Sequence, residues 1–332
     1  MNEDVIFREM DLDGDGKLTR DDIYHAAVHF GWQWQQASIY ALLDLMTLRG
    51  PIDEETFIAQ MITAAGDREG AYGEALRTVT RAIGITDPPP VPVIESPAGG
   101  PVWQGLGIDK VIVRLEHIQD KSYAEDFRSA LKRLNNPCLS VSTDKTALLI
   151  IDPQRSFTAG SWKRSLGSEG DQEVMPVEAV FANCVDLLKT IYRRTQVMFT
   201  RCPFPPDSFG WDERFEGVID ADQYYFIKPG NCVLLPETNG FRERLENMID
   251  RGMKTLVMGG CTLNSCLRIS SLEVLSAFRD TGLNIIVDLS LCGARASNYG
   301  NTKQFGGISA VEMAIKQMTD EGVKVAEGVK WI

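Results

Sequence analysis

The chain has 332 residues, of which 44% are hydrophobic and 24% charged, and its formal net charge is −12. This composition supports a sizeable folded core, and the acidic balance makes nucleic acid an unfavourable partner. No apolar run reaches the length of a membrane span, so we expect no membrane partner, and the first residues lack the basic flank and apolar core of a signal peptide. Seven scattered cysteines are typical of a reducing compartment, which favours a cytoplasmic protein.

The first pattern along the chain is an acidic twelve-residue loop over residues 11–22. Gly16 takes the turn position of an EF-hand loop, and Asp22 takes the last ligand position. Because Asp22 is shorter than the usual bidentate Glu, we expect weakened Ca²⁺ binding with Mg²⁺ as a competitor. The alternative is an acidic surface turn. The expected metal ligands are the side chains or backbone carbonyl of Asp11, Asp13, Asp15, Lys17 and Asp22.

A second loop of the same length, LMTLRGPIDEET, covers residues 45–56. Gly50 and Ile52 occupy the turn and pairing positions, but Leu45, Thr47 and Arg49 stand where the early ligands belong. We therefore expect this loop to pair with the first one without binding an ion. The two together predict a small all-α EF-hand domain over residues 1–66.

Residues 67–142 are predicted to connect this domain to the rest of the chain. Residues 75–85 fit a short helix, and the following stretch TDPPPVPVIESPAGGP is a Pro/Gly-rich linker. Three consecutive prolines stiffen such a segment into an extended spacer.

Beyond residue 142, three apolar strand patterns each end beside a chemically capable side chain. Asp152 follows the strand of TALLIIDPQRSF, and Lys228 follows the aromatic run of QYYFIKPGNCVL. Cys266 follows TLVMGGCTLNS at the start of a helix, where unpaired N–H groups and the helix dipole favour a thiolate. The carboxyl ends of strands in open α/β sheets are where chemistry is placed. The alternatives are a turn cap, a solvated lysine and a buried hydrophobic cysteine.

In order and separation, IIDPQRSF, FIKPGNCVL and NSCLRISSLEVL resemble the motifs of the isochorismatase-like superfamily of cysteine hydrolases. The resemblance covers residues 143–332 and implies a three-layer αβα domain with a mainly parallel sheet, in a protein that forms a homo-oligomer. It also implies a catalytic triad of Asp152, Lys228 and Cys266. Asp152 would act as general base and later as acid, and Lys228 as a fixed positive charge.

The chain departs from the family pattern by one extra residue before the nucleophile, which leaves Cys261 as a rival nucleophile. Cys266 is preferred because the sequence after it continues as the family helix does. The resemblance also implies a cis peptide bond in this turn and an oxyanion hole made by backbone N–H groups of Cys261, Thr262 and Cys266.

Five side chains are candidates for binding the substrate. Arg201 offers a bidentate partner for a substrate carboxylate, with a surface arginine as the alternative. The aromatic candidates suggest a flat or partly apolar small molecule, with a core or subunit-interface role as the alternative. The full set is Phe157, Trp162, Arg201, Phe209 and Trp211.

These features predict hydrolysis of an amide or ureido C–N bond in a small molecule through a thioester. No histidine lies between Asp152 and Lys228, so we expect no metal cofactor in the catalytic domain. The alternatives are an isochorismatase-type vinyl ether hydrolase and a catalytically inactive Ca²⁺-sensing protein. Control of the hydrolase by Ca²⁺ is a hypothesis that rests on the presence of both units in one chain.

Overall fold

The computed structural model describes most of the chain from residue 107 onward and parts of the N-terminal region. Phe209, the expected helix at 75–85 and the Pro/Gly-rich linker lie outside the described residues. Those residues are 7–8, 10–11, 13–29, 43, 46–47, 50–65, 107–120, 122–134, 138–192, 194–202, 210–220, 223–228, 230–235 and 239–332.

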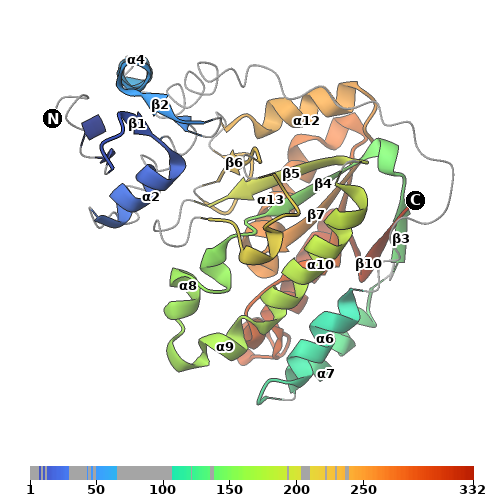
Figure 1. The fold of residues 1–332 in the computed structure, drawn as a ribbon. Helices are drawn as coiled ribbons and strands as arrows, with labels where there is room; N and C mark the ends of the chain where they lie inside the picture. Colours follow the sequence, from blue (N-terminus) through green and yellow to red (C-terminus); the bar gives the residue numbers. More distant parts are fainter. Residues whose placement is uncertain are drawn as a thin grey trace.

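A six-stranded sheet forms the centre of the C-terminal region (Figure 1). Its strands run in the order β6-β5-β4-β7-β8-β9, and every neighbouring pair is parallel. Apolar runs such as TALLII are buried at every position, as expected for strands covered on both faces. The predicted α/β fold around a mainly parallel sheet is confirmed. The strands are β4 (Thr146–Ile151), β5 (Gln196–Arg201), β6 (Phe226–Ile227), β7 (Thr255–Cys261), β8 (Asn284–Gly293) and β9 (Lys324–Ala326).

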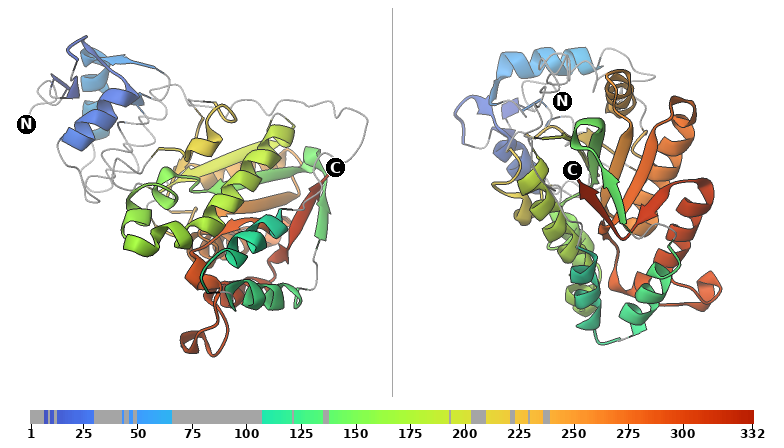
Figure 2. Two further views of the ribbon diagram at one scale, coloured as in Figure 1. Left: turned by 60° about the horizontal axis from the view of Figure 1, so that its bottom comes forward. Right: turned by 90° about the vertical axis from the view of Figure 1, so that its right-hand side faces the viewer.

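Helices cover both faces of this sheet (Figures 1 and 2). One face carries α10 (Met175–Ile191) and α6 (Ile108–Glu116), with α7 (Ser122–Leu131) packed on α6. The other face carries α12 (Phe241–Asp250), α13 (Arg268–Ala277) and α14 (Ala310–Glu321). Among the described residues, no helix is long and apolar enough to cross a membrane. Short helices α8 (Ser161–Arg164) and α9 (Gly170–Glu173) precede α10, and β3 (Cys138–Val141) pairs with β10 (Gly328–Trp331).

The order in which strands are added to the sheet reverses between β4 and β7. The chain moves from β4 to β5 on one side and later returns to place β7 on the other side. In open α/β sheets such a switch point opens a crevice at the carboxyl ends of the two strands. Gly260 at the end of β7 has a φ of +105°, and a Cβ there would lie 2.0 Å from the carbonyl oxygen of Ile151. Glycine therefore allows the two strand ends to approach closely.

The N-terminal region contains two helices joined by a short ladder. β1 (Lys17–Leu18) pairs antiparallel with β2 (Ile52–Asp53), with Leu18 opposite Ile52. The helices α2 (Arg20–His29) and α4 (Glu54–Ala65) follow these strands. Leu18, Ile23 and Phe57 are fully buried, so apolar side chains of this region are packed away from water. The region thus contains a β-ladder in addition to the helices that the sequence predicts.

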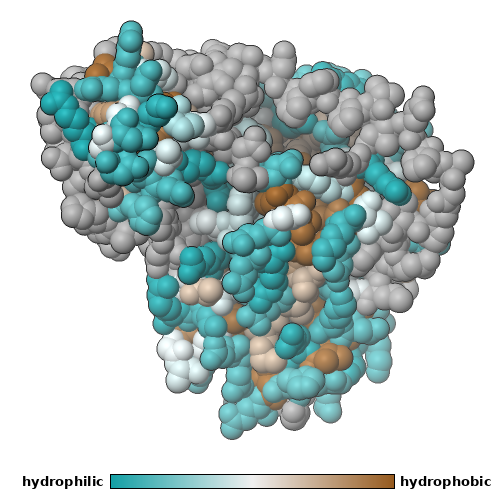
Figure 3. Space-filling view, in the orientation of Figure 1, coloured by the Kyte–Doolittle hydropathy of each residue, from teal (hydrophilic) through white to brown (hydrophobic). Residues whose placement is uncertain are grey.

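The surface facing the viewer in Figure 3 is mainly hydrophilic over the described residues, with hydrophobic residues in smaller areas.

Candidate active site

Asp152 and Lys228 form a buried ion pair at the carboxyl end of the sheet. Asp152 follows β4 and Lys228 follows β6, and Lys228 Nζ lies 2.7 Å from Asp152 Oδ2. Both side chains are fully buried, and Lys228 Nζ also donates a hydrogen bond to the Gly230 carbonyl at 2.8 Å. Burial, the largest single cause, would lower the pKa of Lys228, but the nearby acidic groups, Asp152 first among them, together outweigh burial and the pKa is raised. The lysine is therefore held as a cation.

Thr200 on β5 holds the Asp152 carboxylate in place. Its hydroxyl donates to Asp152 Oδ1 at 2.6 Å and accepts a hydrogen bond from the Asp152 N–H at 3.1 Å. Asp152 has a φ of 48°, in the left-handed region that few residues other than glycine, asparagine and aspartate adopt. The strand end thus turns sharply, and one oxygen of the carboxylate is paired with the lysine while the other is held by Thr200.

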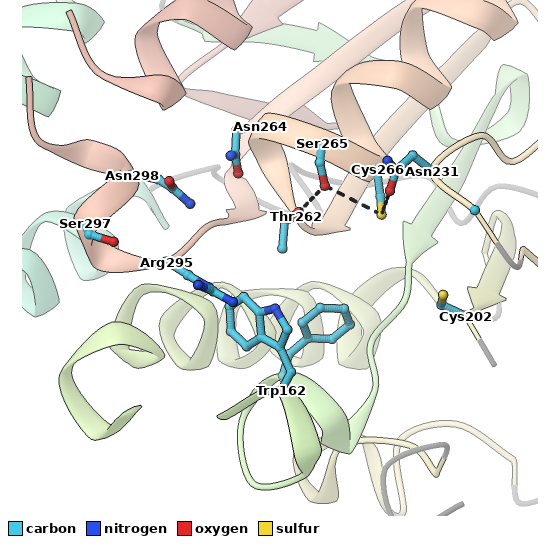
Figure 4. Close-up of a pocket in the computed structure, with 12 residues that line it drawn as sticks. Trp162, Cys202, Asn231, Thr262, Asn264, Ser265, Cys266, Arg295, Ser297 and Asn298 are labelled. Carbon is cyan, nitrogen blue, oxygen red and sulfur yellow. Dashed lines mark hydrogen bonds between the residues drawn. The ribbon is translucent and has the colours of Figure 1, made fainter. Parts of the chain in front are cut away.

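Cys266 lies in a π-helical turn, Leu263–Leu267, between β7 and α13. Its side chain is 9% exposed, and its thiol donates to Asn231 Oδ1 at 3.2 Å (Figure 4). The Ser265 hydroxyl donates to Sγ at 3.8 Å. The peptide bond between Cys261 and Thr262 is cis, as the family resemblance implies.

The surroundings of Cys266 raise the pKa of its thiol. Burial is the largest cause and the Asp152 charge is the second, while Lys228, Ser265 and the Thr262 N–H lower the pKa in part. Hydrogen bonds of this turn lower the thiol pKa, in the direction that the sequence indicates, but burial and the nearby carboxylate prevail and the net shift is upward. The resting group is a thiol that needs a base, and Asp152 is a carboxylate close enough to act on it electrostatically.

A cavity of about 450 Å³ opens onto this thiol. Of the residues singled out from the sequence, Phe157, Trp162, Thr262 and Cys266 line it. Phe157 and Trp162 pack edge to face, with ring centroids 5.2 Å apart. Cys261 is fully buried and is not among the described residues that line the cavity, and burial raises its pKa well above the ordinary value. Both observations favour Cys266 over Cys261 as the nucleophile.

Arg201 and Trp211 lie elsewhere. The Arg201 side chain is 2% exposed, and its guanidinium carbon lies 4.1 Å from the ring centroid of Trp211 and 4.5 Å from that of Tyr225. Neither Arg201 nor Trp211 is among the described residues that line the cavity. The stacked rings occupy the faces of the guanidinium, so the structure does not bring this arginine to Cys266.

Several cavity residues were not singled out from the sequence. Asn231, Asn264 and Arg295 line the cavity together with Ser297 and Asn298 (Figure 4). Arg295 could have been found from the sequence, because it lies two residues after the end of β8 at Gly293. The three triad residues likewise lie at or just beyond strand ends. The asparagines follow no pattern that separates them from turn residues.

The acidic N-terminal loop brings three of its predicted ligands together. Oxygen atoms of Asp11, Asp13 and Asp15 all lie within 4.8 Å of one another, and the Gly16 N–H donates to Asp11 Oδ2 at 2.9 Å. Asp11 Oδ1 is buried and has no hydrogen-bond partner among the described residues. Asp22 Oδ2 instead accepts the N–H and hydroxyl of Thr19 at 2.8 and 2.6 Å, which caps the start of α2. Lys17 lies in β1.

No protein-family model matches the sequence, and a search of curated proteins finds no match. Solved structures similar to the chain include an isochorismatase family protein from Desulfovibrio vulgaris, at 15% identity over 55% of this chain and 93% of that one, with a TM-score of 0.39. A nicotinamidase from Bacillus subtilis shares 16% identity over 55% and 99% of the two chains, with a TM-score of 0.38. A pyrazinamidase from Pyrococcus horikoshii, solved in complex with zinc, shares 16% over 55% and 98%, with a TM-score of 0.37. At these identities and TM-scores, none of them assigns a reaction or a metal to this chain.

Proposed function

We propose that residues 143–332 form a cysteine hydrolase of the isochorismatase-like kind, which cleaves an amide or ureido C–N bond of a small molecule. The observation that carries the proposal is the Cys266 thiol, at the wall of a cavity and next to the fully buried pair of Asp152 and Lys228. A buried base, a fixed cation and a nucleophile are what acyl transfer through a covalent intermediate requires.

In the first half of the reaction Asp152 takes the proton of the Cys266 thiol. Oδ2 has a lone pair for this proton beside its contact with Lys228, while Oδ1 is held by Thr200. The sulfur then bonds to the carbonyl carbon, and the carbonyl oxygen becomes an oxyanion. When the C–N bond breaks, the leaving nitrogen takes the proton from Asp152 and departs as ammonia or an amine, which leaves a thioester.

In the second half a water molecule attacks the thioester and gives its proton to Asp152. The C–S bond breaks, the acid is released, and the proton returns to the Cys266 sulfur. Lys228 keeps its charge throughout, because its role is to stabilise the carboxylate and the thiolate in turn.

The oxyanion is proposed to bind backbone N–H groups of the turn between β7 and α13. The Thr262 N–H belongs to this turn, at the cis peptide bond, and Thr262 lines the same cavity as Cys266. An N–H beside the attacking sulfur is well placed for the oxygen of the bound carbonyl. Cys266 and Cys261 are the other proposed donors.

The test is ammonia release, with mass spectrometry of the second product, from a panel of small amides, ureido compounds and isochorismate. The protein is compared with Cys266→Ala, and with Cys261→Ala as a matched control for loss of a buried thiol in the same turn. Ammonia release that is lost only in Cys266→Ala supports the proposal. Turnover of isochorismate that persists in Cys266→Ala would replace it with vinyl ether hydrolysis, and no turnover of any compound would favour the Ca²⁺-sensing alternative.

The loop over residues 11–22 is proposed to bind Ca²⁺, with Mg²⁺ as a competitor. The three aspartates would hold the ion, and the buried, unpartnered Asp11 Oδ1 fits that role. Calorimetric titration with each ion should show binding that Asp11→Asn abolishes and that Asp21→Asn, a change at an exposed residue of the same loop, leaves intact. Binding that survives Asp11→Asn would reject the site. Four expectations from the sequence stay predictions: control of the hydrolase by Ca²⁺, the limits of the domains, assembly into a homo-oligomer and a cytoplasmic location.

A further inference from the structure

We propose that the substrate carries a carboxylate, which Arg295 binds at the side of the cavity away from Cys266. This inference rests on the proposed function, because it places the scissile carbonyl at Cys266 and uses the remaining cavity to define the rest of the molecule.

The cavity holds a positive charge that no described residue pairs with. Among the described residues that line it, Arg295 alone has a formally charged side chain. Asp152 and Lys228 neutralise each other behind the thiol. Glu173 is near Arg295 in the fold, but it accepts the N–H and hydroxyl of Ser297 at 3.3 and 2.9 Å. Arg295 forms no salt bridge with any described residue. A ligand of opposite charge would therefore complete the site.

Trp162 holds the Arg295 guanidinium in a fixed orientation. The guanidinium carbon lies 4.6 Å from the centre of the Trp162 ring, and Trp162 packs in turn on the buried Phe157. Stacking occupies a face of the guanidinium and leaves its N–H edge available, which is the edge that binds a carboxylate through two parallel hydrogen bonds. In Figure 4 Arg295, Ser297 and Asn298 lie on one side of the view, Cys266 and Asn231 lie on the other, and Thr262 is between them.

Asn264 gives a second, independent indication of the ligand, which is that it carries a hydrogen-bond donor. Asn264 lines the same cavity, and its Oδ1 is buried without a hydrogen-bond partner among the described residues. A buried acceptor without a partner is unfavourable, so a ligand N–H that bonds to it is favoured. An amide or ureido N–H is such a donor. The cavity thus matches a molecule with a carbonyl, an N–H and a carboxylate, and about 450 Å³ is enough for a small acid of this kind.

The single cation favours a carboxylate over a phosphate. A phosphate ester carries nearly two charges at neutral pH and is usually held by more than one cation or by a helix N-terminus. One stacked arginine beside asparagine and serine side chains instead fits a group with one charge and two coplanar oxygens.

The test uses two pairs of substrates, and in each pair the carboxylate of one member is replaced by a neutral carboxamide in the other. The acids are N-carbamoylglycine and N-carbamoyl-4-aminobenzoate. The enzyme is compared with Arg295→Met, Arg295→Lys and Arg279→Met, the last being a matched change at an exposed arginine. We expect the acids to be preferred, and Arg295→Met to lose about 10- to 100-fold in kcat/KM on them, mainly through KM, because a charge-assisted hydrogen bond is lost. Arg295→Lys should recover part of this loss, and Arg279→Met should have no effect.

A second measurement separates this inference from the proposed function. Acetate, succinate and benzoate are titrated calorimetrically into Cys266→Ala and into Cys266→Ala/Arg295→Met. Carboxylate binding that requires Arg295 supports the inference even if no amide is turned over, in which case the proposed function fails alone. Equal turnover of the acids and their neutral amides, unchanged by Arg295→Met, would overturn the inference and leave the proposed function intact. Absence of carboxylate binding together with absence of turnover would reject both.

Discussion

Replacing Asp152 by asparagine separates the roles of base and nucleophile. Asn keeps the shape of the side chain and tolerates the left-handed backbone at φ 48°, so the turn after β4 is preserved. The amide cannot take the thiol proton, and loss of a general base lowers rates by about 10²–10⁴-fold. The Asp152 charge is one of the causes that raise the pKa of Cys266, so its removal does not make the thiol harder to ionise. We therefore expect turnover to fall while alkylation of Cys266 is undiminished.

Asp152→Asn also lowers the free energy of unfolding, because it leaves a buried charge without its partner. Lys228 is fully buried and loses its partner at 2.7 Å. Removing one member of a buried pair costs about 3–5 kcal/mol, which for a domain of this size lowers Tm by roughly 6–20 °C. Replacing both members, in Asp152→Asn/Lys228→Met, removes the unpaired charge and should recover most of the lost stability while turnover stays low.

The assay measures ammonia release and the rate of iodoacetamide labelling of Cys266, with the labelled peptide identified by mass spectrometry. Both are run below the lowest Tm of the variants. Turnover that survives in Asp152→Asn would refute the assignment of the base. Turnover and labelling that fall together would show that Asp152 only shapes the site.

Three further substitutions test the positioning of Asp152, the burial of Asp288 and the close approach of two strands at Gly260. Thr200→Val removes two hydrogen bonds to Asp152 without touching the cavity, and we expect kcat to fall about 10-fold with KM nearly constant; an unchanged kcat would reject the positioning role. Asp288 is fully buried, and burial raises its pKa to about 7 from the ordinary 3.8, so the free energy of unfolding should drop by about 4 kcal/mol as pH rises from the ordinary pKa to neutrality. Urea unfolding across this range should show the decline, and Asp288→Asn should remove it; an unaltered profile would contradict the burial argument. Gly260→Ala should prevent folding because its Cβ would lie 2.0 Å from the Ile151 carbonyl oxygen, whereas Gly282→Ala, also at positive φ but with open space around it, should cost about 1 kcal/mol in the same assay.

Two neighbouring strands of the sheet, β4 and β7, were predictable because they are long apolar runs that end at sharp turn signals. Runs such as TALLII and TLVMGG are legible as buried strands, and strand ends are where site residues gather in such folds. That rule led to Asp152, Lys228 and Cys266, and the same rule applied to the end of β8 would have led to Arg295.

Other features depend on contacts that the sequence does not encode locally. The sequence gives no sign that Trp211 and Tyr225 stack on Arg201, which keeps this arginine out of the cavity. The sequence indicates local groups that lower the thiol pKa, but it does not reveal the burial and the Asp152 charge that prevail over them, because both are tertiary effects. Asn264 could not be recognised, since an unpartnered oxygen is visible only when every neighbour is placed.

The central claim is that Cys266 forms a covalent bond to the substrate. It is tested most directly by rapid mixing of the protein with a turned-over amide, acid quench, and mass spectrometry of the intact chain and its peptides. The account predicts an acyl adduct on the peptide containing Cys266, which disappears as water completes the reaction and is absent in Cys266→Ala. An adduct on Cys261, or on Cys202, which also lines the cavity, would contradict this claim. So would product formation by Cys266→Ala at the rate of the unaltered protein.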